Sequence, residues 1–113
     1  MHELSLCENV REVIEEHALA HGLVRVTRVR LEIGRFSCVE KPALAFAFES
    51  VMRRSVADGA VLEIIDVPGH ALCLDCGEDV ELDARFASCP ICVSDKLVQK
   101  GGDEMRVRNL EGV

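Results

Sequence analysis

The sequence contains no long apolar run. Its longest unbroken stretch of apolar side chains, residues 43–48, is far shorter than the roughly 20 residues that a membrane-spanning helix needs. The first residues also lack the basic cluster and apolar stretch of a secretory signal, because short apolar clusters are soon interrupted by Arg11 and Glu12. We therefore expect a protein that does not enter the membrane and stays in the cytoplasm.

Basic side chains are in short supply. Lys and Arg number 13 against 20 Asp and Glu, which gives a formal net charge of -7 at pH 7. Because nucleic-acid binding draws most of its affinity from Lys and Arg that neutralise phosphates, this balance argues against a nucleic-acid partner. The negative charge attracts metal cations weakly, without creating a site.

Internal repeats and low-complexity tracts are absent as well. The chain of 113 residues has 49% hydrophobic content, which predicts a globular protein with one main core and a small appendage.

Apolar spacing predicts two helices. The first is expected over residues 6–21, where Ser5 and Glu8 have the capping-box spacing and Gly22 can end the helix. The second is expected over residues 41–54, with Pro42 near its start.

Three further segments have strand patterns. Residues 24–33 alternate between apolar and polar side chains in two phases, which allows an irregularity near Thr27, and residues 105–110 also have a strand pattern. Residues 61–67 are apolar on both faces, which favours a position near the sheet centre. Because the amides of a C-terminal strand need partners, we expect residues 105–110 to join the other two strands.

The expected fold class is α+β, with two helices on a three-stranded mixed sheet and an inserted zinc-ribbon-like module. Residues 1–69 and 102–113 would form the α/β domain, and residues 70–101 the insertion.

Four of the six cysteines form two Cys-x-x-Cys pairs. Cys73 and Cys76 are separated from Cys89 and Cys92 by twelve residues, a spacing at which two short turns can hold one zinc ion tetrahedrally. Residues 77–88 contain few apolar side chains, so metal ligation, which contributes about 10 to 16 kcal/mol in small peptides, is expected to fold this module.

Other uses of the four cysteines fit less well. A redox pair needs one Cys-x-x-Cys at the start of a helix, and a disulfide framework needs an oxidising compartment. Ligation of an iron–sulfur cluster stays open, because spacing alone does not distinguish it from zinc.

The N-terminus has the donors of a second metal site. With His2 in second position, the terminal amine, the His2 backbone nitrogen and the imidazole can close fused chelate rings around Ni(II) or Cu(II), with Glu3 nearby to add an oxygen. The alternative is an unstructured terminus that binds nothing.

Five motifs carry a family resemblance. They are residues 1–7 (MHELSLC), 26–34 (VTRVRLEIG), 46–49 (FAFE), 73–77 (CLDCG) and 101–104 (GGDE). Together they resemble the HypA/HybF hydrogenase-maturation nickel chaperones over nearly the whole chain.

The resemblance implies a two-helix, three-stranded nickel-binding domain with a zinc domain inserted before the last strand. It implies His2 as the essential nickel ligand with Met1 and Glu3 as contributors, and zinc ligation by Cys73, Cys76, Cys89 and Cys92.

The same resemblance implies that the protein is not an enzyme. Nickel would pass to the hydrogenase large subunit with the GTPase HypB, and in some organisms toward urease. We expect a monomer or weak homodimer. The sequence departs from the family pattern at Val93, where the family often has glycine. This difference concerns the geometry of the local turn and not the four ligands.

Three other histidines are weighed against simpler roles. His17 and His21 are four residues apart and could share a metal, but Ala18 stands where a metalloprotease carries its glutamate. We expect His17 to be half-buried and His21 to be a helix-end cation. His70 could compete for zinc, although a solvent or supporting role is the simpler expectation.

The remaining cysteines, Cys7 and Cys38, are expected to pack as small apolar groups.

A second functional hypothesis remains, in which the chain is a zinc-ribbon adaptor for protein or nucleic acid that handles no nickel.

Overall fold

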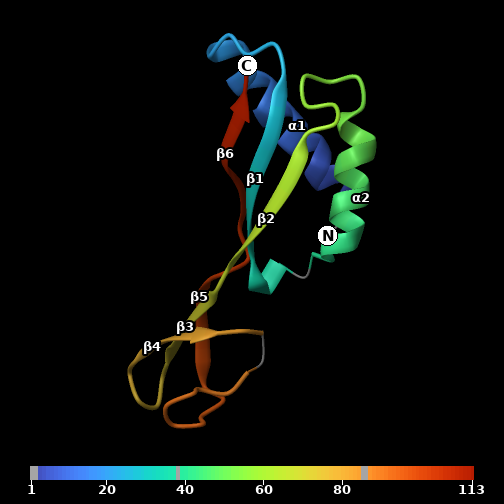
Figure 1. Ribbon diagram of the computed structural model, residues 1–113. Coiled ribbons are helices and arrows are strands. Elements are labelled where there is room, and N and C mark those ends of the chain that lie inside the picture. The colour runs from blue at the N-terminus through green and yellow to red at the C-terminus, as the bar shows by residue number, and fades with distance from the viewer. Residues whose placement is uncertain (1–2, 38, 85–86) are drawn as a thin grey trace. The chain divides into compact units, whose positions relative to one another are not determined.

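The computed structural model describes residues 3–37, 39–84 and 87–113. Figure 1 shows its elements, which follow the order α1 (Glu3–Ala20), β1 (Val26–Gly34), the 3-10 helix η1 (Arg35–Ser37), α2 (Lys41–Met52), β2 (Val61–Val67), β3 (Gly69–Cys73), β4 (Asp79–Leu82), β5 (Leu97–Gly101) and β6 (Met105–Gly112).

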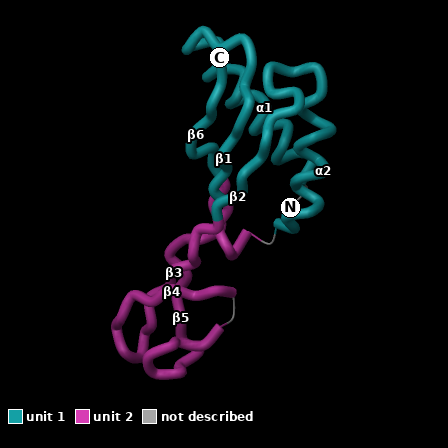
Figure 2. The backbone as a smooth tube through the Cα atoms, viewed as in Figure 1, with its two compact units in different colours: residues 1–32, 39–65, 106–113 teal, residues 33–38, 66–105 magenta. Residues whose placement is uncertain are grey.

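Packing divides the chain into two compact units, which Figure 2 colours separately. The first comprises residues 1–32, 39–65 and 106–113, and the second comprises residues 33–38 and 66–105. Each unit contains one three-stranded sheet, with strand order β2-β1-β6 in the first and β4-β3-β5 in the second. The boundaries proposed from the sequence for independently folding domains stay a prediction.

The first sheet is mixed, as expected. β1 and β2 run in the same direction (Figure 1). β6 runs antiparallel to β1, since the amide of Val113 donates to the carbonyl of Arg25 at 2.9 Å and the amide of Arg25 donates back at 3.3 Å. The prediction that the C-terminal strand joins this sheet is therefore confirmed.

The predicted central position of residues 61–67 is wrong. β1 is the central strand, because β6 pairs with the edge of β1 that β2 leaves open. The apolar residues of β2 are partly buried or, at Val61, exposed, so an apolar pattern on both faces did not signal two neighbouring strands.

Helix α1 buries a narrow apolar stripe. Cys7, Val10, Ile14 and Ala18 are its buried residues, at the spacing of three and four that keeps side chains on one helical face. The capping-box prediction at Ser5 is wrong, because α1 already begins at Glu3 and Ser5 lies within the helix.

The predicted stop of α1 is confirmed. Gly22 has φ 68, a left-handed conformation that glycine adopts without steric penalty. The amide of Leu23 then donates to the carbonyl of Ala18 at 2.8 Å, which satisfies one of the free carbonyls at the helix end.

The helices and one face of β1 share the core of the first unit. α1 packs against α2. Buried and partly exposed side chains alternate from Val29 to Ile33, and the buried Val26 three residues before Val29 marks an irregularity near Thr27. The largest fully buried side chains of this core are Ile14, Val26, Val29, Leu31, Leu44 and Met52.

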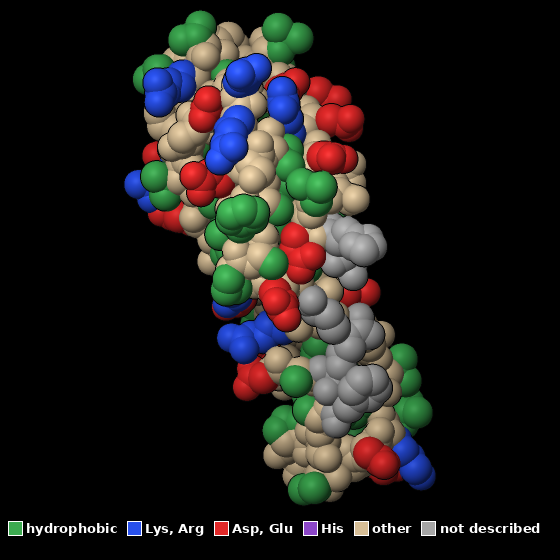
Figure 3. Space-filling view, turned by 90° about the vertical axis from the view of Figure 1, so that its right-hand side faces the viewer, with side chains coloured by type: hydrophobic (Ala, Val, Ile, Leu, Met, Phe, Trp, Pro, Cys, Tyr) green, Lys and Arg blue, Asp and Glu red, His purple; other side chains and the backbone are tan. Residues whose placement is uncertain are grey.

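The opposite face of β1 carries charged side chains that pair across the sheet. Arg30 contacts Glu63 of β2 and Glu111 of β6, each at 2.9 Å, and Arg28 also pairs with Glu63. Such exposed pairs contribute little individually. Acidic and basic side chains also lie beside one another on the face drawn in Figure 3.

Neither helix combines the length and apolar character needed to cross a membrane, within the residues that the structure describes.

The second unit has a small core that includes Phe36, which precedes the other core residues by more than 30 positions in the sequence. Phe36 of η1 is 2% exposed and packs with Ala71, Cys73, Val80, Leu82 and Cys89. Its amide donates to the carbonyl of Gly102 at 2.6 Å. A Cβ atom at position 69 would lie 2.0 Å from the Phe36 ring, so only glycine fits there.

Replacing Phe36 with Ala tests this packing. We expect F36A to lower the free energy of unfolding of the second unit by about 3 kcal/mol, because a buried aromatic side chain leaves a cavity. Phe46→Ala is the matched control, since Phe46 is 74% exposed and surface substitutions change stability by less than about 0.5 kcal/mol. Denaturation monitored by amide signals of β3 measures both. Equal stability of the two variants would contradict the packing role.

Candidate metal centre

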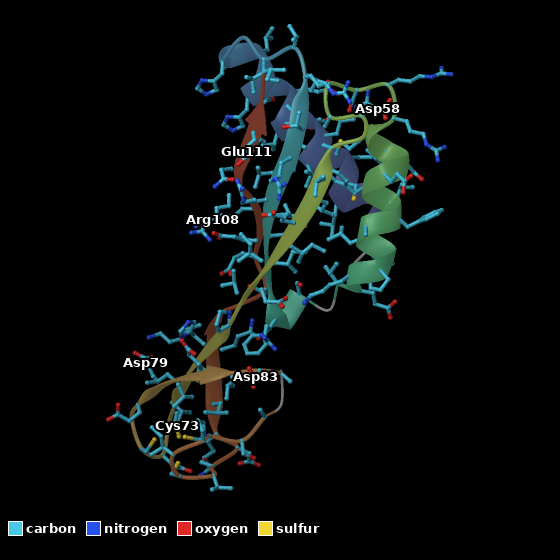
Figure 4. The ribbon with its side chains drawn as sticks, viewed as in Figure 1. Asp58, Cys73, Asp79, Asp83, Arg108 and Glu111 are labelled. Carbon is cyan, nitrogen blue, oxygen red and sulfur yellow. The ribbon has the colours of Figure 1, made fainter. Side chains whose placement is uncertain are left out.

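The four predicted cysteines come together at the end of the second unit. Cys73 ends β3 and Cys76 lies in the turn that follows, whereas Cys89 and Cys92 flank a second turn before β5. Figure 4 shows the sulfur atoms gathered around Cys73. All four Sγ atoms lie within 4.8 Å of one another.

The sulfur spacing fits one four-coordinate ion. The Sγ atoms of Cys73 and Cys92 are 3.5 Å apart, and those of Cys76 and Cys89 are 3.8 Å apart. A tetrahedral zinc–thiolate centre with bonds of about 2.3 Å has sulfur–sulfur distances of about 3.8 Å. The donors therefore stand close to where such an ion requires them.

The two Cys-x-x-Cys turns have the same backbone hydrogen bonds. The amide of Gly77 donates to the carbonyl of Cys73 at 2.9 Å, and the amide of Val93 donates to the carbonyl of Cys89 at 2.8 Å. The amides of Cys73 and Cys89 then donate to the carbonyls five residues ahead, at 3.0 and 2.8 Å. This repetition places the two pairs of thiols in equivalent turns.

Val93 keeps the turn that glycine would favour. Its φ is 64, close to the φ of 76 at Gly77. A β-branched residue is strained in this left-handed region, yet the hydrogen bond to Cys89 is formed. The departure from the family pattern therefore introduces strain without changing the turn.

The environment favours ionisation of one thiol and opposes ionisation of another. The backbone amide of Cys76 is the largest influence on Cys73, and with the amide of Asp75 and neighbouring thiols it lowers the pKa of Cys73 to about 7. At Cys92 the amide of Ser94 lowers the pKa, but the thiol of Cys73, burial and the other thiols raise it to about 12. A bound cation would remove this conflict, because it attracts every thiolate.

Two polar contacts that the sequence did not predict support the cluster. The hydroxyl of Ser94 donates to the carboxylate of Asp75, and so links the two turns. Lys96 lies 3.9 Å from the same carboxylate. Asp75 lies between the cysteines of the first turn, whereas Ser94 and Lys96 follow the cysteines of the second turn, so no shared spacing in the sequence pointed to these contacts.

None of the other predicted ligands is a described member of the sulfur cluster. His2 and Met1 lie outside the described residues, as does Cys38. Glu3 is the first residue of α1 and is partly exposed. His70 is exposed and alternates along β3 with Ala71, so it faces away from Cys73. The described metal-ligand group contains only the four cysteines.

The helix residues had mixed outcomes. Cys7 is 1% exposed, which confirms that it packs as a small apolar group. His17 is exposed, so the prediction that it is half-buried is wrong. The buried stripe of α1 passes through Ile14 and Ala18, and position 17 lies beside this stripe rather than on it.

Removing one thiol should release the metal. We expect Cys73→Ser to reduce the metal content of protein purified with zinc from one equivalent to nearly none, because three thiolates no longer close the coordination sphere. Cys7→Ala is the matched control and should keep the full equivalent, since Cys7 packs in the first unit. Elemental analysis measures both variants, and full metal content in C73S would contradict the assignment.

Replacing Val93 with Gly should stabilise the second unit. Relief of the left-handed strain, reduced by the greater chain entropy of glycine, should raise the free energy of unfolding by about 1 kcal/mol. Val98→Gly is the matched control in the exposed strand β5, where glycine should lower stability by about 0.5 to 1 kcal/mol. Thermal unfolding of the metal-loaded variants provides the measurement, and a lower melting temperature for V93G would contradict the strain.

Comparison with known proteins agrees with this architecture. Residues 1–112 match the HypA family model, described as a hydrogenase/urease nickel incorporation metallochaperone. The hydrogenase maturation factors HypA of Paracoccus denitrificans and Cereibacter sphaeroides are 60% and 55% identical over 111 residues, which cover 98% of this chain and 98% of each relative.

A solved structure has a similar fold. The solution structure of the nickel metallochaperone HypA from Helicobacter pylori has a TM-score of 0.73 and 31% sequence identity, and the alignment covers 100% of this chain and 98% of that chain. The discontinuous fold, the paired cysteine turns and these matches together show that the chain belongs to the HypA family of hydrogenase maturation factors, which are nickel-incorporation metallochaperones and not enzymes.

Proposed function

We propose that this protein holds Ni(II) at its N-terminus and delivers it for maturation of [NiFe]-hydrogenase. The observation that carries this proposal is the match of residues 1–112 to the nickel-incorporation family, combined with a chain that opens Met1-His2-Glu3. The donors would be the terminal amine, the His2 backbone nitrogen and the His2 imidazole, with Met1 and Glu3 as contributors.

The described residues near this terminus support a nitrogen and oxygen donor set. Burial, and secondarily the charge of Glu3, raises the pKa of the Cys7 thiol to about 11. Its Sγ donates to the carbonyl of Leu44 at 3.7 Å. Because the metal-binding form of cysteine is the thiolate, Cys7 does not compete for nickel, and the first turn of α1 offers the Glu3 carboxylate instead.

Lability is the useful property of such a site. A free imidazole has a pKa of about 6.5 and a terminal amine about 7.7 to 8.0, so protons compete with nickel for both nitrogens near neutral pH. Nickel held in this way can be transferred to a protein that offers stronger ligands.

We propose Zn(II) as the structural ion of Cys73, Cys76, Cys89 and Cys92. Four thiolates leave no open coordination position, and zinc prefers the tetrahedral arrangement that the sulfur distances support. The zinc ion would stabilise a unit whose apolar core is small. Zinc would stay bound, and only nickel would be transferred.

The proposed partners are the GTPase HypB and the hydrogenase large subunit, with urease maturation proteins in some organisms. A cytoplasmic protein that is a monomer or weak homodimer suits this role. The alternative function is a zinc-ribbon adaptor without a nickel role, and the two functions differ in whether the N-terminal amine must be free.

Nickel titration of untagged, zinc-loaded protein separates these functions. We expect one tight equivalent of Ni(II), lost in His2→Ala and in protein with an N-terminal extension, because each change removes a chelating nitrogen. His70→Ala is the matched control, since His70 lies on β3 and faces away from the cysteines. Zinc content should stay unchanged in all variants.

Calorimetry provides the measurement. If the tight equivalent persisted in both the H2A variant and the extended protein, nickel carriage at the N-terminus would be refuted. If untagged protein bound no nickel, the adaptor function would be favoured.

A further inference from the structure

The end of helix α1 brings two exposed imidazoles together. The amide of His21 donates to the carbonyl of His17 at 3.1 Å, so the helical backbone continues between them. Their rings are parallel within 2°, with centroids 6.3 Å apart. Residues four apart lie on the same helical face, with Cβ atoms about 5 to 6 Å apart, and a pair of histidines at this spacing can bind one metal ion.

A groove adjoins this pair. It has a volume of about 520 Å³ and separates the last turns of α1 from β6. Its lining includes His17, His21, Leu23 and residues 107–112. Arg108 and Glu111, labelled in Figure 4, project from β6. An ion held by the two imidazoles would therefore have room for further ligands on the groove side.

The charged groups of the groove are already paired elsewhere. Arg108 lies 3.7 Å from the carboxylate of Glu32, which offsets its repulsion of a cation. Glu111 contacts Arg30 at 2.9 Å and Arg28 at 3.6 Å. Among the described residues, neither imidazole has a hydrogen bond or ion pair, so their nitrogens are the groove's available donors.

The helix itself favours a cation at this position. His17 lies in the last turn of α1, where the free carbonyls and the helix dipole carry partial negative charge. Neutral imidazole is a preferred ligand of nickel, copper and zinc. The exposure of both rings gives the ion direct access from solvent.

We propose that His17 and His21 form a second binding site for a divalent transition-metal ion, open to the groove beside β6 and separate from both the N-terminus and the cysteine cluster. Two protein ligands hold the ion more weakly than a closed set, and the remaining coordination positions stay accessible to water or to a ligand from another molecule. The site therefore suits an ion that exchanges readily.

Full-length, zinc-loaded protein that carries His2→Ala and an N-terminal extension provides the test, because it lacks the N-terminal chelate. Titration of this parent with Ni(II) should show one weak equivalent. His17→Ala and His21→Ala should each weaken it at least tenfold, and His70→Ala should leave it unchanged. In NMR spectra of the parent, paramagnetic Ni(II) should broaden the signals of His17 and His21 before others in the first unit.

Two results would overturn the site. One is a parent that binds no nickel in this titration, and the other is equal binding by the parent, H17A and H21A. Circular dichroism checks that α1 persists in both variants. We expect it to persist, because each variant replaces an exposed side chain with a strong helix former. Untagged H17A should retain the tight equivalent, so its loss would show that the imidazole pair belongs to the N-terminal site.

Discussion

Four sulfur atoms within 4.8 Å of one another cannot all lose their protons unless a cation neutralises them. The opposed pKa shifts of Cys73 and Cys92 reflect this constraint. The amide of Cys76 lowers the pKa of Cys73, whereas the thiol of Cys73 raises the pKa of Cys92. The second unit therefore depends on a cation that neutralises the thiolates. Two of these cysteines, Cys73 and Cys89, are also members of the small apolar core, so ligation and packing stabilise the same atoms.

Close backbone packing at glycine completes this unit. The amide of Gly34 donates to the carbonyl of Glu104 at 2.8 Å, and a Cβ atom at Gly34 would lie 2.0 Å from the carbonyl oxygen of Gly102. The ring of Phe36 packs directly against the backbone of Gly69, where a Cβ atom would overlap it. Gly34 and Phe36 thus pack within the unit that carries the cysteines, although they are distant from the cysteines in sequence.

Patterns that depend on local spacing were predictable. The four cysteines, the two helices and the three strands of the first sheet follow from residue spacing, because ligand turns and regular elements impose fixed periods. Strand order was less accessible, since β1 gained its second neighbour from residues far along the chain. The start of α1 was misplaced because the capping pattern at Ser5 competed with a helix that begins two residues earlier.

The entry of Phe36 into the core around the cysteines could not be predicted, because it depends on contacts between segments more than 30 residues apart. The exposure of His17 was missed for a different reason. A helical stripe defined by Ile14 and Ala18 fixes which neighbours are buried, and a small error in its direction moves a flanking residue from the core to solvent.

The interleaved order of the two units has a consequence for biosynthesis. The chain passes between them at residues 32/33, 38/39, 65/66 and 105/106. The second unit therefore has all its residues once residue 105 has been synthesised, whereas the first unit lacks β6 until residues 106–113 follow. Until then the free edge of β1 lacks its antiparallel neighbour, and an unpaired edge can join another chain. Rapid synthesis of the last residues, or temporary shielding by a chaperone, would therefore protect the nascent protein from aggregation.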